Sequence, residues 1–159
     1  MEPLASTDAP AQRGSFEGFF EAEARGQVQR ARLLLGSEES ANEVVQEALL
    51  RVFERWDTIE DPGSYLNRVV LNLCRDRGRR RRRWERMVPR LVDRSVASGD
   101  VEVLDDVLGR LPFNQRAAVV LRYWGGLTNV EIAAELGCAE GSVGPWISRA
   151  VDTLREELA

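Results

Sequence analysis

The side chains best suited to chemistry share one arc of a predicted helix: Arg68, Asn72, Arg75 and Arg79. The same helix runs into five consecutive arginines, Arg79–Arg83. A guanidinium group can bind phosphate oxygens through two parallel hydrogen bonds, and an asparagine amide can address a base edge. The spacing therefore favours nucleic acid as the partner. The alternative is a solvated, charged helix end.

The element that must position these groups is a helix beginning at Asp61. Asp61 is expected to be its N-cap, and Pro62 suits the first helical turn. An apolar stripe with helical spacing predicts the buried side: Tyr65, Leu66, Val69, Val70 and Leu73. One side of the helix should therefore pack in a core while another faces an anionic partner.

Charge is divided unevenly along the chain. Between Arg75 and Arg94, ten arginines face three acidic residues, a local charge of +7 that leaves −11 on the rest of a chain whose net charge is −4. Such a division suggests an anionic partner at one place and a basic partner elsewhere. All 22 basic residues are arginine.

The composition also excludes several kinds of site. The chain has no histidine, and its two cysteines, Cys74 and Cys138, cannot build a four-ligand zinc site. No convergent cluster of carboxylates or of a nucleophile and a base is evident. We therefore expect no enzyme activity, no metal and no cofactor. The absence of an apolar run of membrane length and of a signal pattern predicts a cytoplasmic protein.

The clearest helical period lies between about Ala41 and Trp56. Its inward stripe is predicted to be Val44, Val45, Ala48, Leu49, Val52, Phe53 and Trp56. Its outward arc contains Glu43, Gln46, Glu47, Leu50 and Glu54. A leucine among carboxylates indicates a docking surface for a basic protein partner. A solvated face with one exposed leucine is the simpler alternative.

The remaining pattern predicts an all-α fold of two small helical domains joined by a flexible linker. Residues 1–14 should be a disordered tail. A helix capped by Ser15 and stopped by Gly36 completes a three-helix bundle over residues 15–83. Residues 84–99 read as the linker.

The second domain is expected over residues 100–159. It should contain a short helix ending before Pro112, a helix over Asn114–Trp124 broken by Gly125-Gly126, and two further helices. A capping box, Thr128 to Glu131, opens the first of these, and Gly137 permits the turn after it. This is helix-turn-helix spacing.

The motifs ESANEVVQEALLRVFERW, DPGSYLNRVVLNLCRDRGRR and LPFNQRAAVVLRYWGGLTNVEIAAELGC resemble regions 2 and 4 of sigma-70 family transcription initiation factors. The order of the motifs, with no region 3 between them, is similar to the extracytoplasmic-function (ECF) type. The stretch RRRRRWERMVP is similar to the actinobacterial SigE-family subgroup. The resemblance covers nearly all of the chain from Phe16 to Leu158.

The resemblance implies a promoter-specificity subunit of RNA polymerase. Its partners would be the clamp helices of the largest core subunit, the flap of the second-largest subunit, promoter DNA and an anti-sigma factor. The outward arc at Glu43–Glu54 would bind the clamp helices. Residues implied in −10 recognition and melting are Asp57, Thr58, Ile59, Glu60, Asp61, Arg68, Asn72, Arg75, Arg79 and Arg80. Residues implied at the −35 element are Thr128, Ser142, Gly144, Trp146 and Arg149.

One segment departs from the family pattern, Gly144-Pro145-Trp146, where a basic or hydroxyl-rich run is usual. Proline in a helix interior loses a hydrogen bond and clashes with the preceding turn. We therefore expect Ser142 to cap a helix that runs from about Val143 to Glu157. Trp146 and Arg149 would then lie nearest the DNA groove, unless Trp146 is packed in the core.

Two other functions stay open beside the promoter-specificity subunit. One is a stand-alone helix-turn-helix regulator, which would leave the first bundle without a role. The other is a sigma-like protein that binds polymerase without opening promoters.

Overall fold

The computed structural model describes residues 14–87 and 100–159, and all regular secondary structure within these ranges is helical. The expected all-α class is confirmed. The elements are α1 (Phe16–Leu35), α2 (Glu38–Glu54), α3 (Pro62–Met87), α4 (Asp100–Arg110), α5 (Phe113–Tyr123), α6 (Asn129–Leu136) and α7 (Glu140–Leu158). The predicted tail, except Gly14, and residues 88–99 of the predicted linker lie outside the described residues.

Capping residues set most helix ends where the sequence predicts them. The Ser15 hydroxyl accepts a hydrogen bond from the Gly18 N–H at 3.1 Å, and Gly36 ends α1 with φ of 70°. The Thr128 hydroxyl likewise accepts from the Glu131 N–H at 3.3 Å. Each cap satisfies a backbone group that has no partner inside its helix.

α2 packs its apolar stripe against α1 and α3. Val44, Val45, Ala48, Leu49 and Val52 are almost completely buried, and full burial of a valine or leucine contributes about 1.5–3 kcal/mol. Phe53 was expected in this stripe but is 58% exposed. Only the first turn of α1 reaches this end of α2, so Phe53 has the ring of Phe16 beside it, 5.0 Å away between centroids, and solvent on its other side.

α3 begins at Pro62 as predicted but extends beyond Arg83 to Met87. The first four residues of the predicted linker, 84–87, are therefore helical. Arginine is a good helix former, and neither glycine nor proline occurs between Arg83 and Met87.

The expectation for the last helix is wrong. α7 starts at Glu140 with Ala139 as its N-cap, so Pro145 lies inside it. Proline removes only the hydrogen bond that would end on the Gly141 carbonyl, and Gly141 is exposed, so water can reach that group. Val143, in the first turn of this helix, is 0% exposed and belongs to the core.

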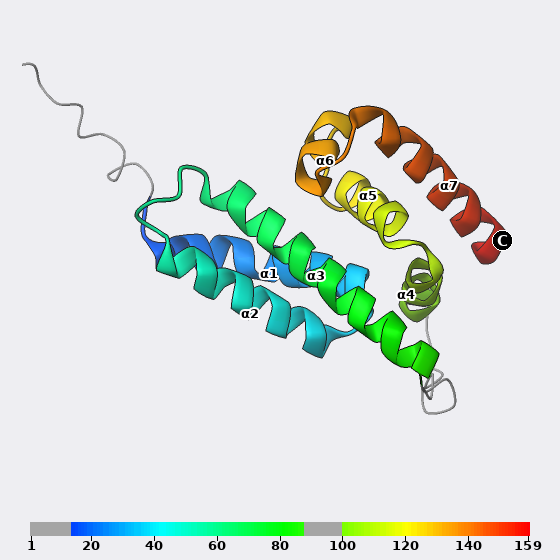
Figure 1. Cartoon of the computed structure of the whole chain (residues 1–159), viewed down its shortest axis with the longest axis horizontal. Coiled ribbons are helices and arrows are strands. Elements are labelled where there is room, and N and C mark those ends of the chain that lie inside the picture. The colour runs from blue at the N-terminus through cyan, green and yellow to red at the C-terminus, as the bar shows by residue number, and fades with distance from the viewer. Residues whose placement is uncertain (1–13, 88–99) are drawn as a thin grey trace, which may run out of the picture.

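The two helical groups pack against each other. Figure 1 shows α1–α3 as one group, with α5–α7 lying beside α3. α1 contacts α4 and α5, α3 contacts α6, and the buried apolar residues of both groups form one cluster. None of the helices in the described ranges combines the length and apolar content needed to cross a bilayer.

Candidate nucleic-acid and protein interfaces

The outward face of α2 has an apolar centre with polar groups around it. Leu50 is 56% exposed. The other residues assigned to this face are also exposed: Glu43, Gln46, Glu47 and Glu54. Helix periodicity places the five residues on one side of α2. α1 and α3 cover the opposite side, so this side faces outward. The face can therefore meet a partner through apolar contact and charge together.

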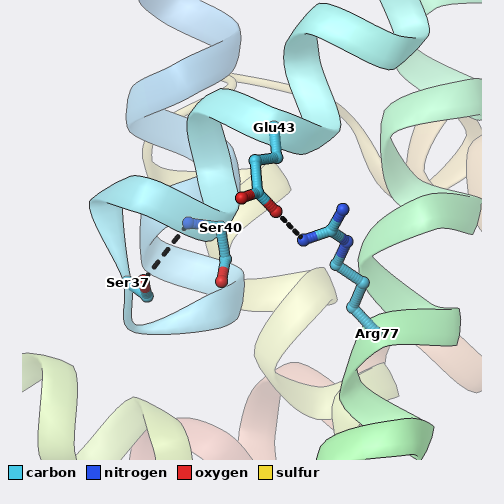
Figure 2. Close-up of polar contacts among 4 residues, drawn as sticks. All are labelled: Ser37, Ser40, Glu43 and Arg77. Atoms are coloured by element: carbon cyan, nitrogen blue, oxygen red, sulfur yellow. Dashed lines mark hydrogen bonds and ion pairs between the residues drawn. The ribbon is translucent and has the colours of Figure 1, made fainter.

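Two carboxylates of this face already have arginine partners within the protein. Arg77 of α3 donates to the Glu43 carboxylate at 2.6 Å, and Arg51 donates to Glu47 at 2.9 Å. Figure 2 shows the Arg77–Glu43 pair close to the hydrogen bond by which Ser37 caps α2. The Glu43 and Glu47 side chains remain 54% and 45% exposed. Ion pairs this exposed contribute about 0–1 kcal/mol, so a basic partner can displace them at small cost.

The arginines of α3 form a second exposed face. Exposed positions recur at helical spacing along it: Arg68, Asn72, Asp76, Arg79 and Arg83. Arg80 is exposed as well. Asp76 is not among the residues predicted for this row, although its spacing along the helix is visible in the sequence. A carboxylate between guanidinium groups would repel a phosphate placed directly above it.

The loop from Asp57 to Asp61 is held by its own residues. Ile59, expected among the DNA contacts, is instead 9% exposed and belongs to the core, so its side chain is unavailable in this conformation. The Thr58 hydroxyl donates to the Arg55 carbonyl at 3.1 Å. The Ser64 hydroxyl and backbone N–H both donate to Asp61, and these bonds lower the pKa of that carboxyl.

Arg75 differs from the other arginines assigned to DNA because it faces the second helical group. Its guanidinium carbon lies 5.3 Å from the centroid of the Phe113 ring on α5, within cation–π range. Arg75 is half-buried. Phe113 therefore covers part of this side chain in the structure.

The residues assigned to the −35 element lie at the start of α6 and along α7. Thr128 and Arg149 are exposed, whereas Ser142 and Gly144 are half-buried. Trp146 is also half-buried and packs against the core, which was the alternative considered for it. α7 carries four carboxylates against two arginines, so its charge favours DNA far less than that of α3 does.

A polar cluster between the two helical groups was not predicted. Asn67 of α3 accepts a hydrogen bond from Gln27 and, at 3.0 Å, from Arg30, both on α1. Its own amide donates to Glu135 of α6 at 3.1 Å. Burial raises the pKa of Glu135. No local signal could reveal these contacts, because the partners lie 40, 37 and 68 residues apart.

The cysteines and acidic residues form no metal site in the part of the chain that the structure describes. There, no three side chains of the His, Cys, Asp or Glu type gather closely enough to hold an ion. Cys74 is buried, and burial raises its pKa to about 12, so its thiol is a poor nucleophile.

Known proteins resemble the chain in both halves. The family description "Sigma-70 region 2" matches residues 19–84, and "Sigma-70, region 4" matches residues 102–154. An RNA polymerase sigma-E factor of Streptomyces avermitilis is 35% identical over 151 residues, covering 90% of this chain and 84% of that protein. The ECF RNA polymerase sigma factor SigM of Mycobacterium tuberculosis is 31% identical over 157 residues, covering 92% and 79%.

The fold resembles that of a solved protein. The sigma factor RpoE of Bartonella quintana, crystallised with the anti-sigma factor NepR, aligns with a TM-score of 0.75 at 23% identity. The alignment covers 90% of this chain and 96% of that one.

Proposed function

The chain belongs to the sigma-70 family of RNA polymerase sigma factors, in its ECF group, and on this premise we propose that it directs core RNA polymerase to particular promoters. Sigma factors are initiation factors without catalytic activity of their own. One observation carries the proposal. The three-helix bundle exposes Leu50 among carboxylates on α2 and a row of guanidinium groups on α3, so it offers a protein and a nucleic acid separate faces.

Polymerase binding is assigned to the α2 face. A basic protein surface can replace Arg77 and Arg51 as the partner of Glu43 and Glu47, while Leu50 supplies an apolar anchor. Charge complementarity of this kind governs orientation and association rate, and the apolar centre supplies most of the affinity.

Recognition of the −10 element is assigned to α3 and the loop before it. Arg68, Arg79 and Arg80 are exposed and would bind phosphates, whereas Asn72 can address a base edge. A base extruded from the duplex would lie near the Asp57–Asp61 loop, with the arginines holding the backbone around it.

Recognition of the −35 element is assigned to α7, with a smaller share of the affinity. Arg149 is an exposed cation at the middle of α7, and Ser142 in its first turn can donate to a phosphate. The shortage of basic residues on α7 also favours the second candidate, a sigma-like protein that binds polymerase but opens few promoters. The two candidates differ in one measurable step, promoter melting.

The experiment is transcription by core polymerase from a randomised promoter library, with and without the protein. We expect RNA with defined start sites only when the protein is present, and sequencing of the transcripts would give the preferred elements. Permanganate footprinting would show melted −10 DNA. Polymerase binding without start sites or melting would support the second candidate, and no binding to polymerase would contradict both.

The α2 assignment has its own test in polymerase pull-down. Leu50→Asp and Glu47→Arg should each weaken core binding, by about thirtyfold where a hot spot is worth 2 kcal/mol. Both residues are exposed and Glu47 loses only a surface ion pair, so the bundle should stay folded. Glu156→Arg, an exposed glutamate on α7, is the charge-matched control. Unchanged core binding by Leu50→Asp would contradict the assignment of polymerase binding to the α2 face.

A further inference from the structure

The exposed row on α3 contains one group that cannot bind phosphate. Its members recur at helical spacing: Arg68, Asn72, Asp76, Arg79 and Arg83. Guanidinium and amide groups can donate to phosphate oxygens, whereas the carboxylate of Asp76 only accepts hydrogen bonds. Asp76 therefore needs a partner that carries N–H donors. Along a DNA strand, such donors occur only on the bases.

A partner within α3 is the simpler explanation for an aspartate among arginines. Asp76 precedes Arg79 by three residues and Arg80 by four, and ion pairs at these spacings stabilise a helix. The ion pairs of the described residues do not include one at Asp76, because α3 contributes Arg77, which pairs with Glu43. Within this part of the chain, the exposed carboxylate keeps its oxygens for a ligand.

The neighbours of Asp76 in the row indicate where a base would lie. Asn72 is one turn before it, and Arg68 and Arg79 stand on either side of this pair. One turn of four residues rises about 6 Å, and stacked base pairs are about 3.4 Å apart. Asn72 and Asp76 can therefore face bases one or two steps apart, while the flanking arginines hold phosphates.

The distance from the loop before α3 separates Asp76 from the extruded base. From Pro62, the first residue of α3, to Asp76 the helix rises about 21 Å. This distance corresponds to about six base-pair steps. A base extruded near the Asp57–Asp61 loop is therefore not the base that Asp76 meets. An α-helix fits the major groove of paired DNA, so we place Asp76 in that groove beside the melted segment.

In the major groove a carboxylate distinguishes cytosine from the other bases. Cytosine presents its N4 amino group there as a donor. Guanine presents two acceptors, and thymine presents an acceptor and a methyl group, so neither can donate to Asp76. Adenine presents a donor beside an acceptor, a pair that suits an amide and brings the acceptor against a carboxylate.

Resting on the function proposed above, we propose that Asp76 is a specificity residue that accepts a hydrogen bond from the N4 amino group of a cytosine in the paired DNA beside the −10 element. The same carboxylate disfavours any register of the DNA that places a phosphate over it. Asp76 thus selects a base and a register. Arg68 and Arg79 supply affinity that is the same for every sequence.

Selection of bound duplexes from a library randomised across and beside the −10 region measures this preference without transcription. The full-length chain is used alone and with core polymerase. For wild type we expect one position at which cytosine is favoured by about fivefold or more. Asp76→Ala should abolish the preference at that position and keep the others. Asp76→Asn should favour adenine there, because an amide pairs with N6 and N7 of adenine.

Asp106→Asn on α4 is the matched control, because this exposed aspartate undergoes the same chemical change outside the row. It should leave every base preference unchanged. Binding isotherms with cytosine or thymine at the selected position then measure the coupling between residue and base. The ratio of the two affinities should be about fivefold or more in wild type and about one in Asp76→Ala.

The outcomes separate this inference from the proposed function. Equal gains in affinity for every sequence in Asp76→Ala and Asp76→Asn, with unchanged preferences, would overturn it and show that the carboxylate only offsets neighbouring guanidinium charge. A wild-type selection without a cytosine preference that depends on Asp76 would also overturn it. A circular dichroism melt verifies that each variant is folded. Failure of protein-dependent transcription would leave the binding selection intact, so the two proposals fail separately.

Discussion

Asp61 stabilises the start of α3 through its carboxylate. The Ser64 hydroxyl donates to it at 2.8 Å and the Ser64 N–H at 3.2 Å, which lowers its pKa from the usual 3.8. Asp61→Ala should lower the free energy of unfolding at neutral pH by about 1 kcal/mol. Because the folded-state pKa is the lower one, this stabilisation is complete above the unfolded pKa and is lost as pH falls through the folded one.

Urea denaturation at pH 7 and at progressively lower pH would measure the Asp61 effect. Asp57→Ala is the control, since Asp57 is exposed in the same loop and is not the residue that caps α3. A difference between wild type and Asp61→Ala that persisted undiminished below both pKa values would contradict the cap as its cause.

The pKa of Glu135 is shifted in the opposite direction to that of Asp61. Burial raises its pKa, with Arg30 and the Asn67 hydrogen bond acting against the shift. The folded state therefore holds the proton more strongly, and the contribution of Glu135 to stability falls as pH rises through the usual value of 4.5 towards the folded one. Glu135→Gln keeps an acceptor for Asn67 and should make the protein as stable or more stable at pH 7.

Denaturation of wild type and Glu135→Gln from acid to neutral pH would measure this dependence. The free energy of unfolding of Glu135→Gln, relative to that of wild type, should rise with pH and then stay constant. Glu21→Gln, at an exposed position on α1, is the control for loss of a negative charge. A strong loss of stability at pH 7 in Glu135→Gln would show that the ionised carboxylate stabilises the contact.

At the scale of elements, α7 contains a proline at a position where a helix-forming residue would make the helix more stable. Pro145→Ala restores the hydrogen bond to the Gly141 carbonyl and should raise the free energy of unfolding by up to about 3 kcal/mol. Ser148→Ala, one turn further along and exposed, should change it by only a few tenths of a kcal/mol. Chemical denaturation followed by circular dichroism distinguishes the two. Equal effects would indicate that the first turn of α7 is not helical in solution.

At the scale of the whole molecule, charge is divided between a basic α3 and an acidic remainder. α3 contains nine arginines and two acidic residues, so it should supply most of the salt-dependent DNA affinity. Arg79→Gln should weaken binding to every sequence and reduce the slope of log affinity against log salt by about 0.7–0.9. Arg25→Gln on α1 is the matched control, and binding isotherms at several salt concentrations measure both. A change in −10 sequence preference with an unchanged salt slope would contradict the phosphate role.

The all-α class, most helix ends and the exposed faces of α2 and α3 could be predicted because their causes are local. Ser15, Gly36, Thr128 and Gly137 act on backbone groups within one turn. The apolar stripe of α2 follows from the helical period alone. A residue and the next one on its face are three or four positions apart, so the pattern is visible in the sequence.

Tertiary structure decided what these elements do to one another. Phe53 is exposed because α1 starts opposite it, and α7 begins one turn earlier than its proline suggests. Asn67 and Glu135 meet across 68 residues. Such contacts depend on how whole helix surfaces fit together, and local preference is too small to determine that fit. The burial of several side chains along a helix together outweighs the loss of one hydrogen bond, and therefore packing sets the final positions.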